Sequence, residues 1–196
     1  MKKGIVILII VAVVVIGIYA WVKGAYNGMV SSDEKVQAAW SQVENVYQRR
    51  ADLIPNLVAT VKGYAEHESE TLQGVVQARA KATQTTVDVE NLTSESLAKY
   101  QKAQGELSSA LGKLLMIQEN YPNLKANQNF LDLQSQLEGT ENRIAVERQK
   151  FNEVARSYNT LIRQFPKNIF AGMFGFEKKP YFEADETAKT APQVKF

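Results

Sequence analysis

The only histidine of the chain, His67, has acidic neighbours that could bind a metal ion with it. Glu66, Glu68 and Glu70 surround it in the stretch AEHESE. The di-iron pattern of helical bundles needs a Glu three residues before a His on two helices, plus two further inward carboxylates. Position 64 is a tyrosine, so the pattern is missing, and adjacent acids on a helix point in different directions. We therefore expect a solvated charged face and no metal site.

The residue inventory excludes other kinds of catalytic site. The chain has no cysteine, which excludes thiol nucleophiles, disulfides and cysteine-ligated zinc. It also lacks a Gly-x-Ser-x-Gly elbow and a glycine-rich phosphate loop. We therefore predict that the protein is not an enzyme and uses no cofactor. With 23 Lys and Arg against 21 Asp and Glu, no excess of positive charge points to nucleic acid as a partner.

Several polar residues lie on or beside the apolar stripes of the predicted helices, where a charge is costly unless it is paired. These residues form a candidate interhelical polar network: Arg49, Arg50, Glu141, Arg148, Asn152 and Asn159. Arg50 takes a position between Tyr47 and Ile54 at which the pattern calls for an apolar side chain. We predict that Arg50, with Arg49 beside it, pairs with Glu141 and fixes the helix register. The alternative is that both arginines reach the surface along their aliphatic stems.

The elements that must position these residues begin with an uncharged stretch, GIVILIIVAVVVIGIYAWV, at residues 4–22. As a helix it would be about 28 Å long, close to the roughly 30 Å of a bilayer's hydrocarbon core. Tyr19 and Trp21 lie at its end and Lys23 comes next, as is typical of a membrane boundary. We predict a short tail at 1–3 and a single-pass transmembrane helix at 4–22, with the lipid bilayer as its partner.

A cleaved signal peptide is the alternative interpretation of this stretch. Its apolar region is usually shorter and leads into a small-x-small cleavage site, whereas Ile18 and Lys23 occupy the upstream positions here. For an uncleaved anchor, Lys2 and Lys3 with the amino terminus outnumber Lys23 and Lys35, which keeps the tail in the cytoplasm. We expect a membrane protein with an extracytoplasmic body, and a cytoplasmic body as the alternative.

The rest of the chain is patterned for helices, with no sustained strand-like alternation. We expect a juxtamembrane linker at 23–30, a helical bundle domain at 31–183 and a disordered tail at 184–196. The first helix should start near Ser31, with a kink or a restart at Pro55, and its stripe should continue to Val76. A loop at 83–91 should precede a second helix that Thr93 or Ser94 caps.

The sharpest pattern is an apolar residue at every seventh position of the third helix, expected from about Gln128 to Phe165. The series consists of Phe130, Leu137, Ile144, Phe151, Tyr158 and Phe165. A seven-residue repeat keeps one stripe on a partner helix when helices pack with a slight left-handed, coiled-coil-like twist. The predicted fold class is therefore all-α, an elongated antiparallel bundle of three to four long helices preceded by one transmembrane helix.

After Pro166 the chain becomes rich in aromatic residues, with Phe170, Phe174 and Phe176 among glycines and lysines. One interpretation is a short helix and turn that closes one end of the bundle. The other is a segment that contacts the membrane surface or a partner.

Several motifs in a fixed order resemble the LemA family of bacterial membrane proteins. They are RRADLIPNLV (Arg49–Val58), VKGYAEHE (Val61–Glu68), ENYPNLKANQNF (Glu119–Phe130), Thr140-Glu141, FNEVARSYNTLIRQFP (Phe151–Pro166) and Tyr181-Phe182-Glu183. The resemblance runs from about Tyr26 to Glu183. It implies a short N-terminal tail, one transmembrane helix, a helical bundle and no known catalytic activity. One branch of the family is associated with organising magnetosome membranes.

The function expected from these features is that of a membrane-anchored, non-catalytic module that scaffolds or organises protein or membrane assemblies. Its protein partners are unidentified, and self-association into a homo-oligomer is possible through leftover apolar faces. The alternative function is a sensory or small-ligand-binding ectodomain. A polar cavity near Tyr64, Arg79 or Asn152 would favour that alternative.

Overall fold

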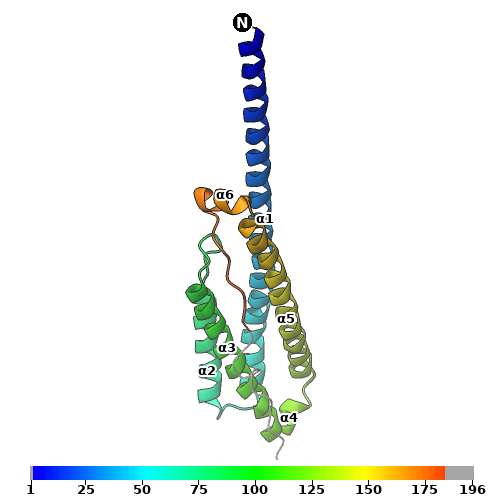
Figure 1. Cartoon of the computed structure of the whole chain (residues 1–196). Helices are drawn as coiled ribbons and strands as arrows, with labels where there is room; N and C mark the ends of the chain where they lie inside the picture. The colour runs from blue at the N-terminus through cyan, green and yellow to red at the C-terminus, as the bar shows by residue number, and fades with distance from the viewer. Residues whose placement is uncertain (1, 184–196) are drawn as a thin grey trace, which may run out of the picture. The chain divides into compact units, whose positions relative to one another are not determined.

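The computed structural model describes residues 2–183, and these residues form helices, turns and an extended segment without any strand. The elements in chain order are α1 (Lys2–Lys62), α2 (Ser69–Gln84), α3 (Ser94–Met116), the 3-10 helix η1 (Ile117–Asn120), α4 (Pro122–Lys125), α5 (Gln128–Arg163) and α6 (Lys167–Phe174) (Figure 1). The predicted all-α class is confirmed for this part of the chain. Met1 and the predicted tail at 184–196 lie outside the described residues.

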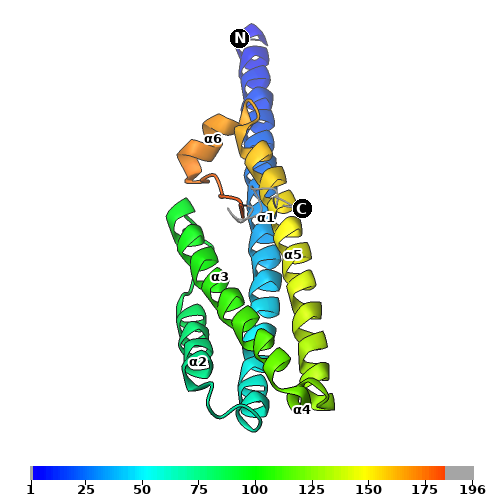
Figure 2. The ribbon, with the colours of Figure 1, turned by 90° about the horizontal axis from the view of Figure 1, so that it is seen from below.

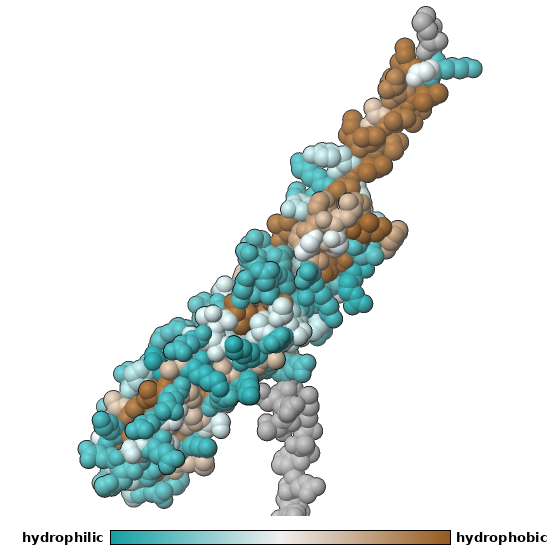
Figure 3. All heavy atoms as spheres, turned by 90° about the vertical axis from the view of Figure 1, so that its left-hand side faces the viewer, coloured by the Kyte–Doolittle hydropathy of each residue, from teal (hydrophilic) through white to brown (hydrophobic). Residues whose placement is uncertain are grey.

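Helix α1 continues without a break through the expected linker at 23–30 and past the expected helix start at Ser31. That start was wrong because no proline separates the apolar stretch from the residues after it, and Gly24 and Gly28 only weaken a helix. The large apolar side chains between Ile5 and Tyr19 are 53% to 70% exposed, and they form the brown rod in Figure 3. The helix is long and apolar enough to cross a membrane.

Pro55 does not restart the helix, which runs on to Lys62. Proline has no amide hydrogen, so the carbonyl of Ala51 loses its partner inside the helix. The Nε of Arg79, on α2, donates to that carbonyl at 2.8 Å. The expected first helix instead ends at the turn that begins at Gly63, and α2 is a separate element.

The chain divides into two compact units, and α1 and α5 contribute to both. Among the described residues, unit 1 contains 2–38 and 153–179, and unit 2 contains 39–152 and 180–183. In unit 2, α2 and α3 lie side by side (Figures 1 and 2). An apolar cluster in unit 2 draws on α1 to α5, with Leu57, Leu114 and Phe130 completely buried in it. The core of unit 1 includes Met29 and Ala155.

The seven-residue series on α5 is buried from Phe130 to Tyr158. Its last member, Phe165, is 81% exposed, because α5 already ends at Arg163. The predicted cap of α3 is confirmed, since the Thr93 side chain accepts the amide hydrogen of Ser96. The predicted stripe fails at Val76, which is 51% exposed.

Candidate functional site

Arg50 lies at the centre of a polar cluster in unit 2, which we call the Arg50 hub. Its side chain is 1% exposed. One terminal nitrogen donates to Ser108 Oγ at 2.7 Å and to Glu141 Oε1 at 2.5 Å, and the other donates to Gln104 Oε1 at 2.7 Å. The structure therefore brings Arg50 and Glu141 together, and the guanidinium joins α1 to α3 and α5. Arg49, in contrast, lies on the exposed side of α1.

Further contacts extend the hub to α2. The amide of Gln104 donates to the backbone carbonyl of Ala82 at 3.4 Å, and the guanidinium of Arg50 lies 5.1 Å from the ring centre of Tyr47. Glu141 is 47% exposed while its partner is buried, so water screens only one end of the ion pair. Ser108 Oγ also donates to Glu141 Oε1 at 3.4 Å, which ties α3 to α5. The arrangement can hold helices in register.

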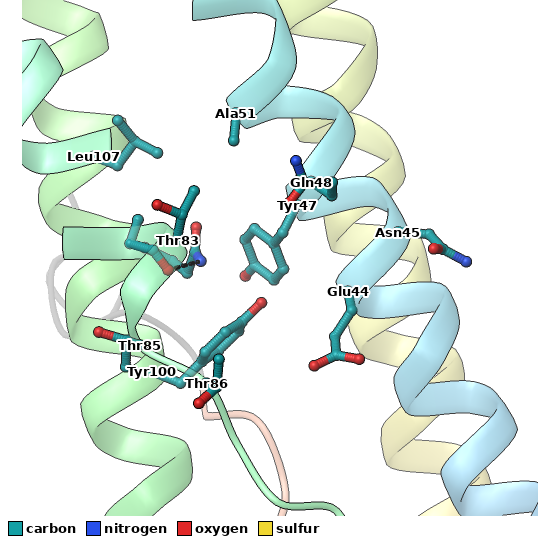
Figure 4. A pocket seen from close by; sticks show the side chains of 12 residues that line it. Glu44, Asn45, Tyr47, Gln48, Ala51, Thr83, Thr85, Thr86, Tyr100 and Leu107 are labelled. Atoms are coloured by element: carbon teal, nitrogen blue, oxygen red, sulfur yellow. Dashed lines mark hydrogen bonds between the residues drawn. The ribbon is translucent and has the colours of Figure 1, made fainter. Parts of the chain in front are cut away.

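A small pocket of about 220 Å³ lies against this hub, between α1, α2 and α3. Tyr47 and Tyr100 border it with their hydroxyl groups facing each other (Figure 4), and their ring centres are 5.4 Å apart. Burial raises the pKa of the Tyr100 hydroxyl above its ordinary value, and the neighbouring Tyr47 hydroxyl and Glu44 carboxylate add to the shift. The pocket is smaller than the roughly 300 Å³ at which small-ligand sites usually begin.

The three residues around which a ligand cavity was expected do not line this pocket. Arg79 donates to the carbonyl of Ala51. Tyr64 accepts a hydrogen bond from the amide of Asn127 at 2.9 Å, and Asn152 binds backbone groups of Phe182. Arg79 nevertheless lies next to the pocket, because it bonds to Ala51 and Thr83, and both of these residues line it.

The asparagines assigned to the interhelical network hold the extended segment that comes after α6. In unit 2, Asn152 donates to the carbonyl of Phe182 at 2.9 Å and accepts its amide hydrogen at 2.8 Å. In unit 1, Asn159 does the same to Lys179, at 2.8 and 2.9 Å. Arg148 donates to the carbonyl of Glu183 at 2.7 Å. These three residues thus bind the main chain of the extended segment and are not members of the hub.

Unit 1 contains a buried lysine that the sequence did not single out. Lys179 is 5% exposed, and its Nζ lies 3.3 Å from Oδ1 of Asp33 and 6.0 Å from the ring centre of Tyr158. Burial raises the pKa of Tyr158, and the nearby carboxylates of Asp33 and Glu177 raise it further. No sequence signal pointed to this pair, because Asp33 looked like part of a helix start and Lys179 like a surface charge.

The aromatic residues proposed as membrane or partner contacts pack onto α1 within unit 1. Phe170 meets Trp21 edge-on at 5.4 Å, and Phe174 and Phe176 meet Tyr26 at 5.0 and 5.7 Å. The chain leaves α6 through Gly175, whose φ of 75° suits a residue without a side chain.

His67 lies in the turn between α1 and α2 and is exposed, so the charged helical face expected there is a turn. Its neighbour Glu68 accepts a hydrogen bond from the Tyr121 hydroxyl at 3.3 Å. Among the described residues, no three side chains of the metal-binding types come together.

Comparison with known proteins agrees with the sequence motifs. The sequence model of the LemA family matches residues 39–196. Magnetosome protein MamQ of Magnetospirillum gryphiswaldense is 30% identical over 190 residues, which covers 86% of this chain and 70% of that protein. Protein LemA of Metamycoplasma hominis is 26% identical over 175 residues, 89% of this chain and 76% of its own length. The chain belongs to the LemA family.

Proposed function

We propose that the protein is a membrane-anchored, non-catalytic helical bundle that scaffolds or organises protein or membrane assemblies at the bacterial cell membrane. Residues 4–22 would hold it in the bilayer as a single pass, and the two units would offer surfaces to partner proteins or to a second copy. The tail before the span would stay in the cytoplasm, and the chain after the span would lie outside.

The observation that carries this proposal is the uncovered apolar start of α1. Its large aliphatic side chains are more than half exposed, although apolar surface in water costs about 25 cal/mol per Å². A bilayer removes that cost, and it also suits a helix whose backbone groups bond internally. MamQ is named a magnetosome protein, which agrees with a role at a membrane.

The polar groups support the non-catalytic part of the proposal. The Arg50 hub and the two asparagines are occupied by contacts that join helices or hold the extended segment. LemA and MamQ relatives are not known as enzymes.

The anchor is tested on isolated membranes washed with alkaline carbonate. The full chain should remain in the membrane pellet. Replacing Ile10 and Val13 by lysine should release it, because each central lysine costs about 2.5 to 3.5 kcal/mol of insertion free energy. Lysine at the exposed Gln73 and Gln136 serves as the matched control and should not release it. Release of the parent protein would refute the anchor.

The scaffolding role is tested by the size of the particle extracted from cells in a mild detergent. We expect a native mass above that of one detergent-bound chain, with stoichiometric proteins in the particle or several copies of this one. A single chain with no partner, extracted at its natural expression level, would refute scaffolding while leaving the anchor intact. A reporter fused after Phe196 decides the orientation, and cytoplasmic activity of that reporter would reverse our assignment.

A further inference from the structure

Helix α6 is fixed to α1 through one of its two apolar faces. Phe170 and Phe174 pack edge-on against Trp21 and Tyr26, and Ala171 is 4% exposed. Both ribbon views show α6 crossing the direction of α1 and not running along it (Figures 1 and 2). All of these residues belong to unit 1.

The opposite face of α6 is apolar as well but has no cover within the described part of the chain. Ile169 and Met173 are one turn apart, hence on the same side of the helix, and they are 52% and 72% exposed. Phe165 precedes the helix and is 81% exposed. Apolar side chains gather around α6 beside the apolar stretch of α1 (Figure 3). We call Phe165, Ile169 and Met173 the outer stripe.

The charges near the outer stripe are positive. No acidic residue occurs from Arg163 to Phe176, while Arg163 precedes the stripe and Lys167 lies between Phe165 and Ile169 in the sequence. Helices that lie in a membrane interface combine such basic residues with large apolar ones, and the basic side chains interact with lipid phosphates.

The contacts to α1 set the depth at which α6 would meet a bilayer. Trp21 and Tyr26 are five residues apart, which is about 7.5 Å along the helix axis. The headgroup zone is about 5 to 8 Å thick on each side of the hydrocarbon core. If residues 4–22 fill that core, these two aromatic residues lie across the headgroup zone, and α6, which they hold, lies at the same level.

We propose that α6 is an interfacial helix whose outer stripe inserts into the lipid headgroup layer next to the transmembrane segment. The inference rests on the proposed membrane anchor and adds a second lipid contact, more than 140 residues later in the sequence. Helix α6 packs against Trp21 at the end of the apolar stretch that the anchor presents to lipid, and its direction across α1 places the helix along the membrane plane (Figure 1). The occupant of the stripe is therefore the bilayer itself.

The absence of cysteine in the sequence allows a test with single labelled sites. The full chain carries Met173→Cys, labelled with a polarity-sensitive fluorophore, and is reconstituted in vesicles of phosphatidylcholine and phosphatidylglycerol. Lipids with a nitroxide near the headgroup serve as quenchers. Ser157→Cys, on the exposed side of α5 in the same unit, is the matched control, and Val13→Cys with a deep nitroxide reports on the anchor.

We expect a blue shift and loss of intensity at position 173 with the shallow nitroxide, no loss at 157, and loss at 13 with the deep nitroxide. Quenching at 13 without quenching at 173 would overturn the interfacial helix and leave the anchor standing. No quenching at 13 would overturn both. A label at 173 that is shielded both from aqueous iodide and from the nitroxide would mean that another protein chain covers the stripe. Equal quenching at 157 and 173 would mean that α6 lies no closer to the lipid than the exposed side of α5. Either result overturns the inference.

Discussion

At the residue scale, one guanidinium meets acceptors from two other helices because arginine carries five hydrogen-bond donors in a rigid plane. Arg50 directs its terminal nitrogens to Ser108, Glu141 and Gln104. A lysine would offer a single charged point on a flexible stem and would not match this set. The helix register in unit 2 therefore depends on the identity of this side chain as well as on its charge.

Replacing Arg50 should destabilise unit 2 strongly. In Arg50→Met the buried Gln104 and the carboxylate of Glu141 lose their donor, and we expect the free energy of unfolding to fall by about 3 kcal/mol. Glu141→Gln should cost only about 1 kcal/mol, because Glu141 is half exposed and an amide oxygen still accepts a hydrogen bond. Urea denaturation of the detergent-solubilised protein, followed by circular dichroism, measures both changes.

The control for this pair is Glu138→Gln, which alters an exposed carboxylate one turn from the hub and should change stability by less than about 0.5 kcal/mol. An Arg50→Met protein as stable as its parent would show that the hub does not hold the helices together.

Tyr100 should make the protein sensitive to alkaline conditions. Its folded-state pKa is raised, chiefly by burial, so above about pH 10 the unfolded chain loses this proton while the folded chain keeps it. The stability it contributes is therefore complete below that pH and falls as the pH rises. Denaturation between about pH 9 and 11 should show a shallower decline for Tyr100→Phe than for the parent.

Thr86→Ala, which alters the same pocket without removing a titrating group, is the matched control and should keep the parental decline. An equally steep decline in Tyr100→Phe would assign the alkaline sensitivity to other groups.

The sequence located some of these residues and not others, for a physical reason. Arg50 stands out because it interrupts an apolar stripe, so a buried partner could be expected, and Glu141 is an acid that borders the seven-residue series of the third helix. Lys179 gives no such signal, because it lies in an extended segment where neither helical nor strand periodicity marks the buried side. Asn152 and Asn159 were recognised as sharing a face, but their partners are main-chain groups, which every residue carries.

At the element scale, α1 passes Pro55 because a side chain from α2 replaces the missing intrahelical hydrogen bond. Arg79 donates to Ala51 at the carbonyl that Pro55 leaves unpaired. The energetic cost of the proline is thereby shared between two helices.

This sharing predicts a coupling between positions 55 and 79 in a double-mutant cycle. Arg79→Met in the parent should cost about 1 to 2 kcal/mol of unfolding free energy, because the carbonyl loses its donor. In the Pro55→Ala background the helix supplies its own amide hydrogen, so the same substitution should cost clearly less. Urea unfolding of the four proteins gives the coupling energy, expected to be about 1 kcal/mol.

Arg156→Met, on α5 and exposed, should cost the same in both backgrounds. If Arg79→Met also costs the same with or without Pro55, the hydrogen bond to Ala51 does not compensate for the proline.

The lengths of the elements were predicted with uneven success. The start of α5 at Gln128 and the cap of α3 could be predicted from periodicity and capping chemistry. The turn at Gly63 was missed because apolar residues continue with helical spacing on both sides of it, through Val61 and Leu72. Spacing alone does not show whether a stripe belongs to one helix or to two that pack on the same core.

At the scale of the whole molecule, residues 3–20 of α1 are all exposed and contribute no buried side chain to either core. The first buried side chain of the described chain is Ala25, and the next is Met29. A protein without residues 2–20, which keeps the contact of Trp21 with Phe170, should therefore keep its helical circular dichroism, with a free energy of unfolding within about 0.5 kcal/mol of the parent. Loss of helix beyond the deleted residues would show that the span supports the fold.

The asparagine contacts to Lys179 and Phe182 determine which substitutions the extended segment tolerates. Each asparagine side chain bonds to the main-chain N–H and C=O of one residue and not to a side chain. Substitutions at Lys178 or Tyr181 therefore leave these hydrogen bonds in place. Proline at 179 or 182 would remove the amide hydrogen that Asn159 or Asn152 accepts. At positions 179 and 182 these hydrogen bonds need only an amide hydrogen and a carbonyl, while the buried side chains of Lys179 and Phe182 make contacts of their own with Asp33 and Trp40.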